Sequence, residues 1–248
     1  MGRRKLPLKT FVEAGTSVLC LALLSLLSRG YAAGYVPVRQ DGGEVRVYVD
    51  PSESRVVLYT TFTVNVSIAN AGGAGLYSYV FKLHFNNSLL QGIDVVLPVN
   101  HFLTPHVPGN LFVVACWINQ TGGYAEVAVT LLDDELGKDG NGTLAAANFR
   151  AQELGSSNLT ISDCFLVDPY AQDHEQAIVV NGLVEIVLPD FNEDGRVDAS
   201  DLDIICEAFG SCKSDEKWNP TCDVNNDGKI NIIDVAVTAK AFGKVAPQ

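Results

Sequence analysis

Two acidic segments near the end of the chain hold the residue types best suited to binding a metal. They are "DFNEDGRVDASD" at 190–201 and "DVNNDGKINIID" at 223–234, and the second begins 33 residues after the first. Both place carboxylates or amides at positions 1, 3, 5, 9 and 12, with glycine at position 6. A twelve-residue loop with oxygen ligands at positions 1, 3, 5, 7, 9 and 12 wraps one calcium ion. The repeat therefore predicts two calcium ions.

The predicted ligands are side-chain oxygens, except at position 7, where the backbone carbonyl serves. In the first loop they are Asp190, Asn192, Asp194, Arg196 (carbonyl), Asp198 and Asp201. In the second loop they are Asp223, Asn225, Asp227, Lys229 (carbonyl), Asn231 and Asp234. Glycine at position 6 permits the sharp bend that such a loop needs. An acidic, disordered tail is the alternative that a charge run alone would indicate, and the shared register of the two loops argues against it.

Each acidic loop is followed by one short amphipathic segment that ends at Phe-Gly, with the glycine placed to cap a helix. Both loops end in aspartate, and the residues before Asp190 read as a strand and a turn rather than a helix. A duplicated loop–helix unit of this kind resembles a type I dockerin domain over residues 190–243. The resemblance implies a cohesin-bearing protein as the partner of this module. It also implies partner contacts at loop positions 10 and 11, which are Ala199, Ser200, Ile232 and Ile233.

The two repeats differ at these contact positions, because the first carries Ala199 and Ser200 and the second carries two isoleucines. We therefore expect one dominant binding orientation rather than two symmetry-related ones. Between the repeats, Cys212 and Cys222 flank a segment without periodicity, and we predict a disulfide between them. Cys206, beside Ile205, would then be a buried free thiol.

The middle of the chain, residues 44–188, has a periodicity of two. In residues 61–68, Phe62, Val64, Val66 and Ile68 alternate with polar side chains, as expected for a half-buried strand. About nine such runs, separated by Gly, Asn and Pro clusters, predict a mainly β fold: a jelly-roll β-sandwich followed by a small all-α calcium-binding module of two loop–helix repeats, residues 189–248. We expect the aromatic row Tyr77, Tyr79, Phe81 and Phe85, and also Trp117, to pack in the core.

The order of these runs resembles a cohesin domain, in the segments 45–51, 62–70, 75–83, 87–90, 144–151 and 181–186. The resemblance implies a protein-binding module without catalytic residues, whose partner is a dockerin-bearing protein. Two alternatives stay open for the sandwich. One is a carbohydrate-binding module that binds polysaccharide, since such modules share the jelly-roll fold. The other is a glycoside hydrolase that uses the acidic turn Asp133, Asp134 and Glu135.

The first 34 residues differ from the rest in charge and hydropathy. Arg3, Arg4, Lys5 and Lys9 precede an apolar run at 17–27, and small residues follow up to Gly34. This pattern predicts a cleaved signal peptide over 1–34, a linker over 35–43, and an extracellular protein. An uncleaved N-terminal anchor is the alternative, although the run is shorter than the roughly 20 residues of a spanning helix.

The net charge of −12 and the pI of about 4.6 argue against nucleic acid and anionic lipid as partners. The resemblances to a cohesin and to a dockerin together imply a secreted, non-catalytic adaptor in a calcium-dependent extracellular assembly, with polysaccharide degradation as the process it would serve.

Overall fold

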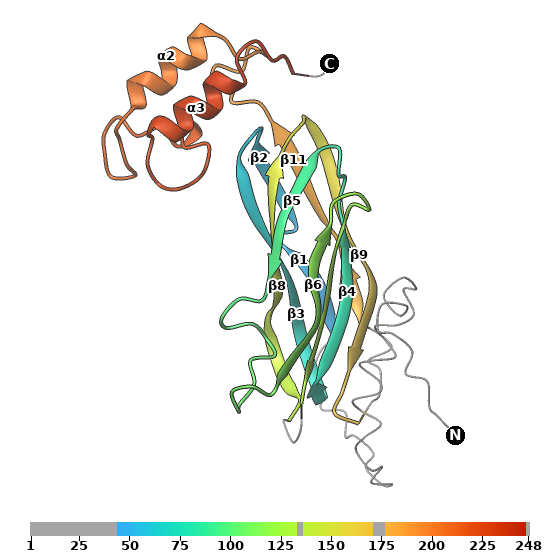
Figure 1. Cartoon of the computed structure of the whole chain (residues 1–248). Helices are drawn as coiled ribbons and strands as arrows, with labels where there is room; N and C mark the ends of the chain where they lie inside the picture. The colour runs from blue at the N-terminus through green and yellow to red at the C-terminus, as the bar shows by residue number, and fades with distance from the viewer. Residues whose placement is uncertain (1–43, 133–135, 171–176, 247–248) are drawn as a thin grey trace, which may run out of the picture.

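The computed structural model describes residues 44–132, 136–170 and 177–246. The predicted signal peptide (1–34), the linker (35–43) and the acidic turn at 133–135 lie outside these residues. Within the described ranges, no helix is both long and apolar enough to cross a membrane. Figure 1 shows a long β-sandwich and, beyond the end where β2 and β11 lie, a small helical module.

The sandwich has a five-stranded sheet in the order β10-β1-β3-β8-β5 and a six-stranded sheet in the order β2-β11-β9-β4-β7-β6. Most neighbours are antiparallel, and the pairs β1–β10 and β2–β11 are parallel. The strands are β1 (Arg46–Asp50), β2 (Glu53–Val57), β3 (Thr61–Leu76), β4 (Ser78–His84), β5 (Leu90–Val96), β6 (Leu111–Asn119), β7 (Tyr124–Leu131), β8 (Lys138–Ala151), β9 (Gly155–Val167), β10 (Ile178–Val180) and β11 (Gly182–Val187).

Eleven strands stand in the described residues where about nine were predicted. The predicted run at 178–188 divides into β10 and β11, which lie in different sheets. Strands β1 and β2 also lie in different sheets, and β2 lies outside the run predicted at 45–49. Where β10 passes into β11, the chain approaches β1 closely: a Cβ on Gly182 would lie 2.7 Å from Cγ1 of Val49. Only glycine fits between the strands there.

The aromatic row packs in the core between the sheets, as predicted. Tyr77, Tyr79, Phe81 and Phe85 are all buried. The Tyr79 hydroxyl donates a 2.7 Å hydrogen bond to the carbonyl of Leu144, which satisfies its one polar atom inside the apolar layer.

The prediction for Trp117 is wrong, because its side chain is 41% exposed on the outer side of β6. Strand β6 lies at the edge of its sheet and is apolar on both faces, so alternation could not show which side faces the core. A register shift between Val113 and Ala115 also interrupts its pairing with β7. Cys116 faces inward instead, and its thiol donates a 3.2 Å hydrogen bond to the carbonyl of Val95.

The C-terminal module consists of α2 (Ala199–Ala208), the short 3-10 helix η2 (Pro220–Cys222) and α3 (Ile232–Lys240). Both α-helices begin with a reciprocal capping box, in which the residue before the helix and the aspartate three positions later bond each other's backbone. A small core of Ile205, Ala208, Cys222 and Ile230 holds the two repeats together. Prediction and structure therefore agree on the fold class.

Candidate calcium loops and interaction surfaces

The two loop–helix repeats complete each other through an exchange of backbone hydrogen bonds. Val197, at position 8 of the first loop, makes bonds of 2.9 and 2.8 Å with residues 244 and 243, which follow α3. Ile230, at position 8 of the second loop, makes bonds of 2.9 and 2.8 Å with residues 211 and 210, which follow α2. Both side chains are fully buried. Each loop is therefore fixed by the segment that follows the other repeat's helix.

In the first loop, the side chains at positions 1, 3 and 5 gather around the bend. The Asp190 carboxylate accepts hydrogen bonds from the backbone amides of Asp194 (3.2 Å) and Gly195 (2.8 Å). The side-chain amide of Asn192 donates to the carboxylate of Asp194 at 3.0 Å. Gly195 has a φ of +88°, a conformation that glycine adopts without strain.

The second loop repeats this arrangement. Asp223 accepts from the backbone amides of Asp227 (3.0 Å) and Gly228 (2.9 Å), and Asn225 donates to Asp227 at 3.0 Å. The structure thus brings together the predicted ligands at positions 1, 3 and 5 in both loops.

The aspartates at position 12 are fully buried and hold each loop against its helix. Asp201 accepts from the backbone amides of Phe191 (2.7 Å) and Asp198 (2.9 Å). Asp234 accepts from the corresponding amides of Val224 (3.1 Å) and Asn231 (2.8 Å). The loop sequence indicated these aspartates as ligands, but it did not reveal this second, structural role.

The residues at position 9 also have a structural role, because they cap the helices. The Asp198 carboxylate accepts from the amide of Ser200 at 2.9 Å, and the Asn231 side chain accepts from the amide of Ile233 at 2.8 Å. At position 7, the backbone amides of Arg196 and Lys229 donate to the position 5 aspartates at 3.0 and 2.9 Å, and both side chains are exposed.

The chemistry of the loops fits a hard cation. Burial raises the pKa of the Asp234 carboxyl, and the nearby carboxylates of Asp223 and Asp227 raise it further. A bound cation would relieve this crowding of like charges. In the described part of the chain, no three His, Cys, Asp or Glu side chains are placed so that they alone could hold a metal ion. The predicted sets also include the asparagine at position 3 and the carbonyl at position 7, and oxygen ligands of these kinds suit calcium.

The four residues of the predicted partner contact lie in the first turns of α2 and α3. Ala199 and Ser200 are exposed, while Ile232 and Ile233 are 67% and 53% exposed. The two isoleucines are apolar, β-branched and uncovered, which is typical of a residue pair that a partner covers.

The predicted disulfide between Cys212 and Cys222 is absent from the structure, in which both are free thiols. Cys222 is fully buried in the small core, whereas Cys212 is half-buried and its amide bonds the Asp215 carboxylate at 2.8 Å. The segment between them is held by this turn and by η2 rather than by a covalent clip. The prediction that Cys206 is buried is also wrong: Ile205 turns into the core, and its neighbour on the helix turns to solvent.

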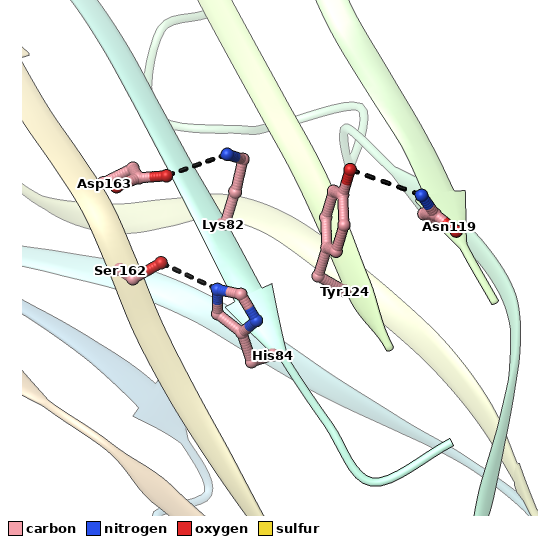
Figure 2. Close-up of polar contacts among 6 residues, drawn as sticks. All are labelled: Lys82, His84, Asn119, Tyr124, Ser162 and Asp163. Atoms are coloured by element: carbon pink, nitrogen blue, oxygen red, sulfur yellow. Dashed lines mark hydrogen bonds and ion pairs between the residues drawn. The ribbon is translucent and has the colours of Figure 1, made fainter. Parts of the chain in front are cut away.

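The outer side of the six-stranded sheet carries a second candidate surface, which no motif had indicated. We call it the Trp117 face, and it comprises Lys82, His84, Trp117, Tyr124 and Asp163. Figure 2 shows the polar contacts that order it: Lys82 bonds Asp163 at 2.8 Å, His84 shares a 2.8 Å hydrogen bond with Ser162, and Asn119 donates to the Tyr124 hydroxyl at 3.3 Å.

Aromatic contacts and charge complete the Trp117 face. The rings of Trp117 and Tyr124 meet edge to face at 5.7 Å, and the Lys82 ammonium lies 5.5 Å from the centroid of the Tyr124 ring. The pKa of the nearby Glu126 carboxyl is raised, because the effect of burial is larger than the opposing effect of the Lys82 charge. Two further exposed aromatic side chains, Phe112 and Phe165, extend the apolar part of this side of the sheet.

Comparisons with known proteins divide the chain in the same way. Residues 188–243 match the family model of the dockerin type I domain. No curated protein matches the chain.

Solved structures similar to the N-terminal part of the chain are cohesins. A non-cellulosomal cohesin from Archaeoglobus fulgidus is 18% identical, with a TM-score of 0.46, covering 60% of this chain and 94% of that one. The sixth cohesin of scaffoldin B from Acetivibrio cellulolyticus, in complex with a Cel5 dockerin, is 16% identical, with a TM-score of 0.47 and coverages of 58% and 99%. A type I cohesin–dockerin complex from Clostridium thermocellum is 14% identical, with a TM-score of 0.48 and coverages of 58% and 100%.

Proposed function

We propose that this chain is a secreted, non-catalytic adaptor that joins two different proteins through two separate surfaces. The observation that carries this proposal is the dockerin type I match over residues 188–243, which contains both acidic loops. A module of that family binds a cohesin-bearing protein, so the C-terminal module is the end by which the chain attaches to a larger assembly.

Calcium controls the module in this proposal. The two loops contribute a dense set of carboxylates to a segment with only a small apolar core. Small modules of this kind need further stabilisation, and a bound metal supplies it while cancelling the repulsion among the acids. Two ions, one in each loop, are therefore part of the folded and binding-competent state.

The exposed pair Ile232 and Ile233 is the main partner contact of the module. Both side chains project from the first turn of α3, beside the second loop, so calcium in that loop would fix their position. The equivalent residues of the first repeat, Ala199 and Ser200, present little apolar surface. This difference favours one dominant binding orientation.

On the sandwich, the Trp117 face is the surface that binds a dockerin-bearing protein. It combines exposed aromatic side chains with an ordered set of charged and polar groups, and interface centres are typically rich in aromatic residues within a polar rim. Lys82, which is paired with Asp163 on this face, contributes a basic group that suits an acidic partner such as a calcium-binding module.

A carbohydrate-binding sandwich is the second candidate, and the exposed position of Trp117 favours it. A tryptophan beside a tyrosine, with hydrogen-bonding groups close by, also suits a sugar ring. Under this alternative, the dockerin module carries a polysaccharide-binding module into the assembly. The third alternative, a glycoside hydrolase that uses residues 133–135, has no further observation in its favour.

The connection between the modules supports an adaptor rather than a chain that binds itself. Strand β11 ends at Val187 and the first ligand is Asp190, so two residues connect the sandwich to the loop. A linker that cannot span two sites gives an effective concentration near zero. Binding between copies would be head-to-tail and would produce rings or open filaments. Sedimentation velocity in calcium at rising concentration should show one monomeric species, and chains that dissolve on chelation would contradict the adaptor.

The experiment that tests the proposed function compares binding by three forms of the full chain. Immobilised wild type, Ile232→Asp/Ile233→Asp and Trp117→Ala are each exposed, with calcium, to a purified cohesin domain and a purified dockerin module from the same secreted protein set, and to insoluble polysaccharide. We expect cohesin binding to be lost only in the isoleucine variant and dockerin binding only in the tryptophan variant. Polysaccharide binding that Trp117→Ala abolishes, without dockerin binding by the wild type, would establish the second candidate instead.

A further inference from the structure

The C-terminal end of α3, taken here with the segment that follows it up to Lys244, touches the sandwich through two lysines. The Lys240 ammonium lies 4.0 Å from the centroid of the Tyr59 ring, and the Lys244 ammonium lies 3.5 Å from a carboxylate oxygen of Glu153. Tyr59 and, after it, Glu153 raise the pKa of Lys244, so both residues favour its charged form. Tyr59 lies in the turn between β2 and β3, and Glu153 lies in the turn between β8 and β9.

Tyr59 is held in a conformation that needs support from its surroundings. Its φ of +73° lies in the left-handed region, where bulky residues are genuine outliers. The backbone compensates, because the Tyr59 amide donates a 3.0 Å hydrogen bond to the carbonyl of Ala151. Part of its side chain also packs against the large core of the sandwich. These contacts fix the ring against Lys240 of the module, and strain of this kind often marks a functional position. The module lies beyond the end of the sandwich at which β2 and β11 lie (Figure 1).

The two repeats of the module are not equivalent at this contact. The positions 33 residues earlier, after the first loop, hold Glu207 and Ser211 in place of Lys240 and Lys244. Glutamate at the first of these positions has no positive charge to place over the Tyr59 ring, and serine at the second cannot form an ion pair with Glu153. Only the second repeat can therefore rest on this end of the sandwich.

We propose that the C-terminal end of α3 is an intramolecular docking surface, and that its partner is the Tyr59–Glu153 end of the chain's own sandwich. An exposed ion pair and an exposed cation–π contact are each weak between separate molecules. Here the two-residue connection after β11 keeps the surfaces close, so weak contacts are enough to favour the docked arrangement.

Docking at this end of α3 leaves the other end open. Ile232 and Lys240 are the first and last residues of the helix, about 12 Å apart along its axis. The contact therefore leaves the isoleucine pair uncovered, while it fixes the direction in which the module projects from the sandwich. The sandwich and the C-terminal module are then held at one fixed angle, whereas a flexible linker would let them move independently.

The test measures whether the two parts tumble together, and it needs no binding partner. Amide nitrogen relaxation of the purified full chain in calcium gives separate rotational correlation times for the sandwich and the module. We expect one common value for the wild type and for Lys213→Glu, a control that reverses an exposed charge elsewhere on the module. We expect two distinct values for Tyr59→Ala/Glu153→Lys and for Glu153→Lys, with an unchanged circular dichroism spectrum.

Restoring the charge pair provides the second half of the test. Glu153→Lys/Lys244→Glu recreates an ion pair with its charges exchanged, so it should return to a common correlation time. Two values in the wild type would overturn the proposal. So would a common value that persists in Glu153→Lys, or a charge exchange that fails to restore it. None of these results would bear on whether the module binds a cohesin, because no partner is present.

Discussion

Replacing Asp201 by alanine should unfold the C-terminal module and leave the sandwich intact. The Asp201 side chain is fully buried, and its carboxylate accepts hydrogen bonds from the amides of Phe191 at 2.7 Å and Asp198 at 2.9 Å. Alanine would strand both amides without an acceptor. Each buried unsatisfied donor costs about 1–3 kcal/mol, and bonds to a charged group lie at the upper end. The expected loss for the two amides together is therefore about 4–6 kcal/mol.

A loss of that size reaches most of the free energy of unfolding of so small a module, which lies near the lower end of the usual range of about 5–15 kcal/mol. The assay is circular dichroism at 222 nm during urea unfolding in calcium, where the helices contribute separately from the strands. Asp201→Asn keeps one acceptor oxygen and should lose about half as much.

The matched control is Asp203→Ala, an exposed aspartate on the same helix, for which we expect a change within about 0.5 kcal/mol. Asp234→Ala should behave like Asp201→Ala, because it accepts the equivalent pair of amides. A helical signal in Asp201→Ala that unfolds at the same urea concentration as in the control would refute the reasoning.

Three further predictions concern metal, thiols and pH. Calcium titrated calorimetrically into the calcium-free chain should bind at two ions per chain, and Asp190→Ala should bind one ion. Addition of a chelator should reduce the helical circular dichroism signal and leave the strand signal unchanged. Exposed Cys206 should react with a thiol reagent at once, whereas Cys222, whose pKa burial raises to about 11, should react only after unfolding. Because burial raises the pKa of Glu126, the folded chain binds that proton more tightly, and its contribution to stability falls as pH rises above the usual pKa of a glutamate. Glu126→Gln should therefore gain stability relative to wild type as the pH rises above that usual pKa, measured by urea titrations.

Each of these predictions has a result that would contradict it. Calcium binding would be misassigned if Asp190→Ala still bound two ions. Rapid modification of Cys222 in the folded chain would show that the small core is open, and failure of both Cys212 and Cys222 to react after unfolding would reinstate the disulfide. A constant stability difference between Glu126→Gln and wild type across the pH range would mean that burial does not shift this carboxyl.

The acidic loops could be predicted from the sequence because their ligands, bend and apolar anchor are all local. Position 12 was evident as a candidate ligand, yet its hydrogen bonds to the amides of Phe191 and Val224 depend on how the loop closes, which spacing does not reveal. The alternating strands were predictable for the same local reason. The side chain of Trp117 was not, because a strand that is apolar on both faces does not indicate which face is covered.

The contacts between distant segments could not be predicted from the sequence. Nothing local to Tyr59 or to Lys240 shows that they meet, since the meeting depends on the turn between β2 and β3 and on the short connection after β11. The two crossings between the sheets were not predicted either, because the sequence does not show that β1 and β2, or β10 and β11, lie in different sheets, and the close packing of Gly182 against Val49 appears only in the structure.

The central claim is that two separate surfaces bind two different classes of protein. Its most direct test is capture from the organism's own secreted proteins by the immobilised full chain in calcium, followed by elution with chelator and identification by mass spectrometry. The account predicts two groups of captured proteins: cohesin-bearing proteins lost only in Ile232→Asp/Ile233→Asp, and dockerin-bearing proteins lost only in Trp117→Ala. A single group lost in both variants, or binding that neither variant affects, would contradict it.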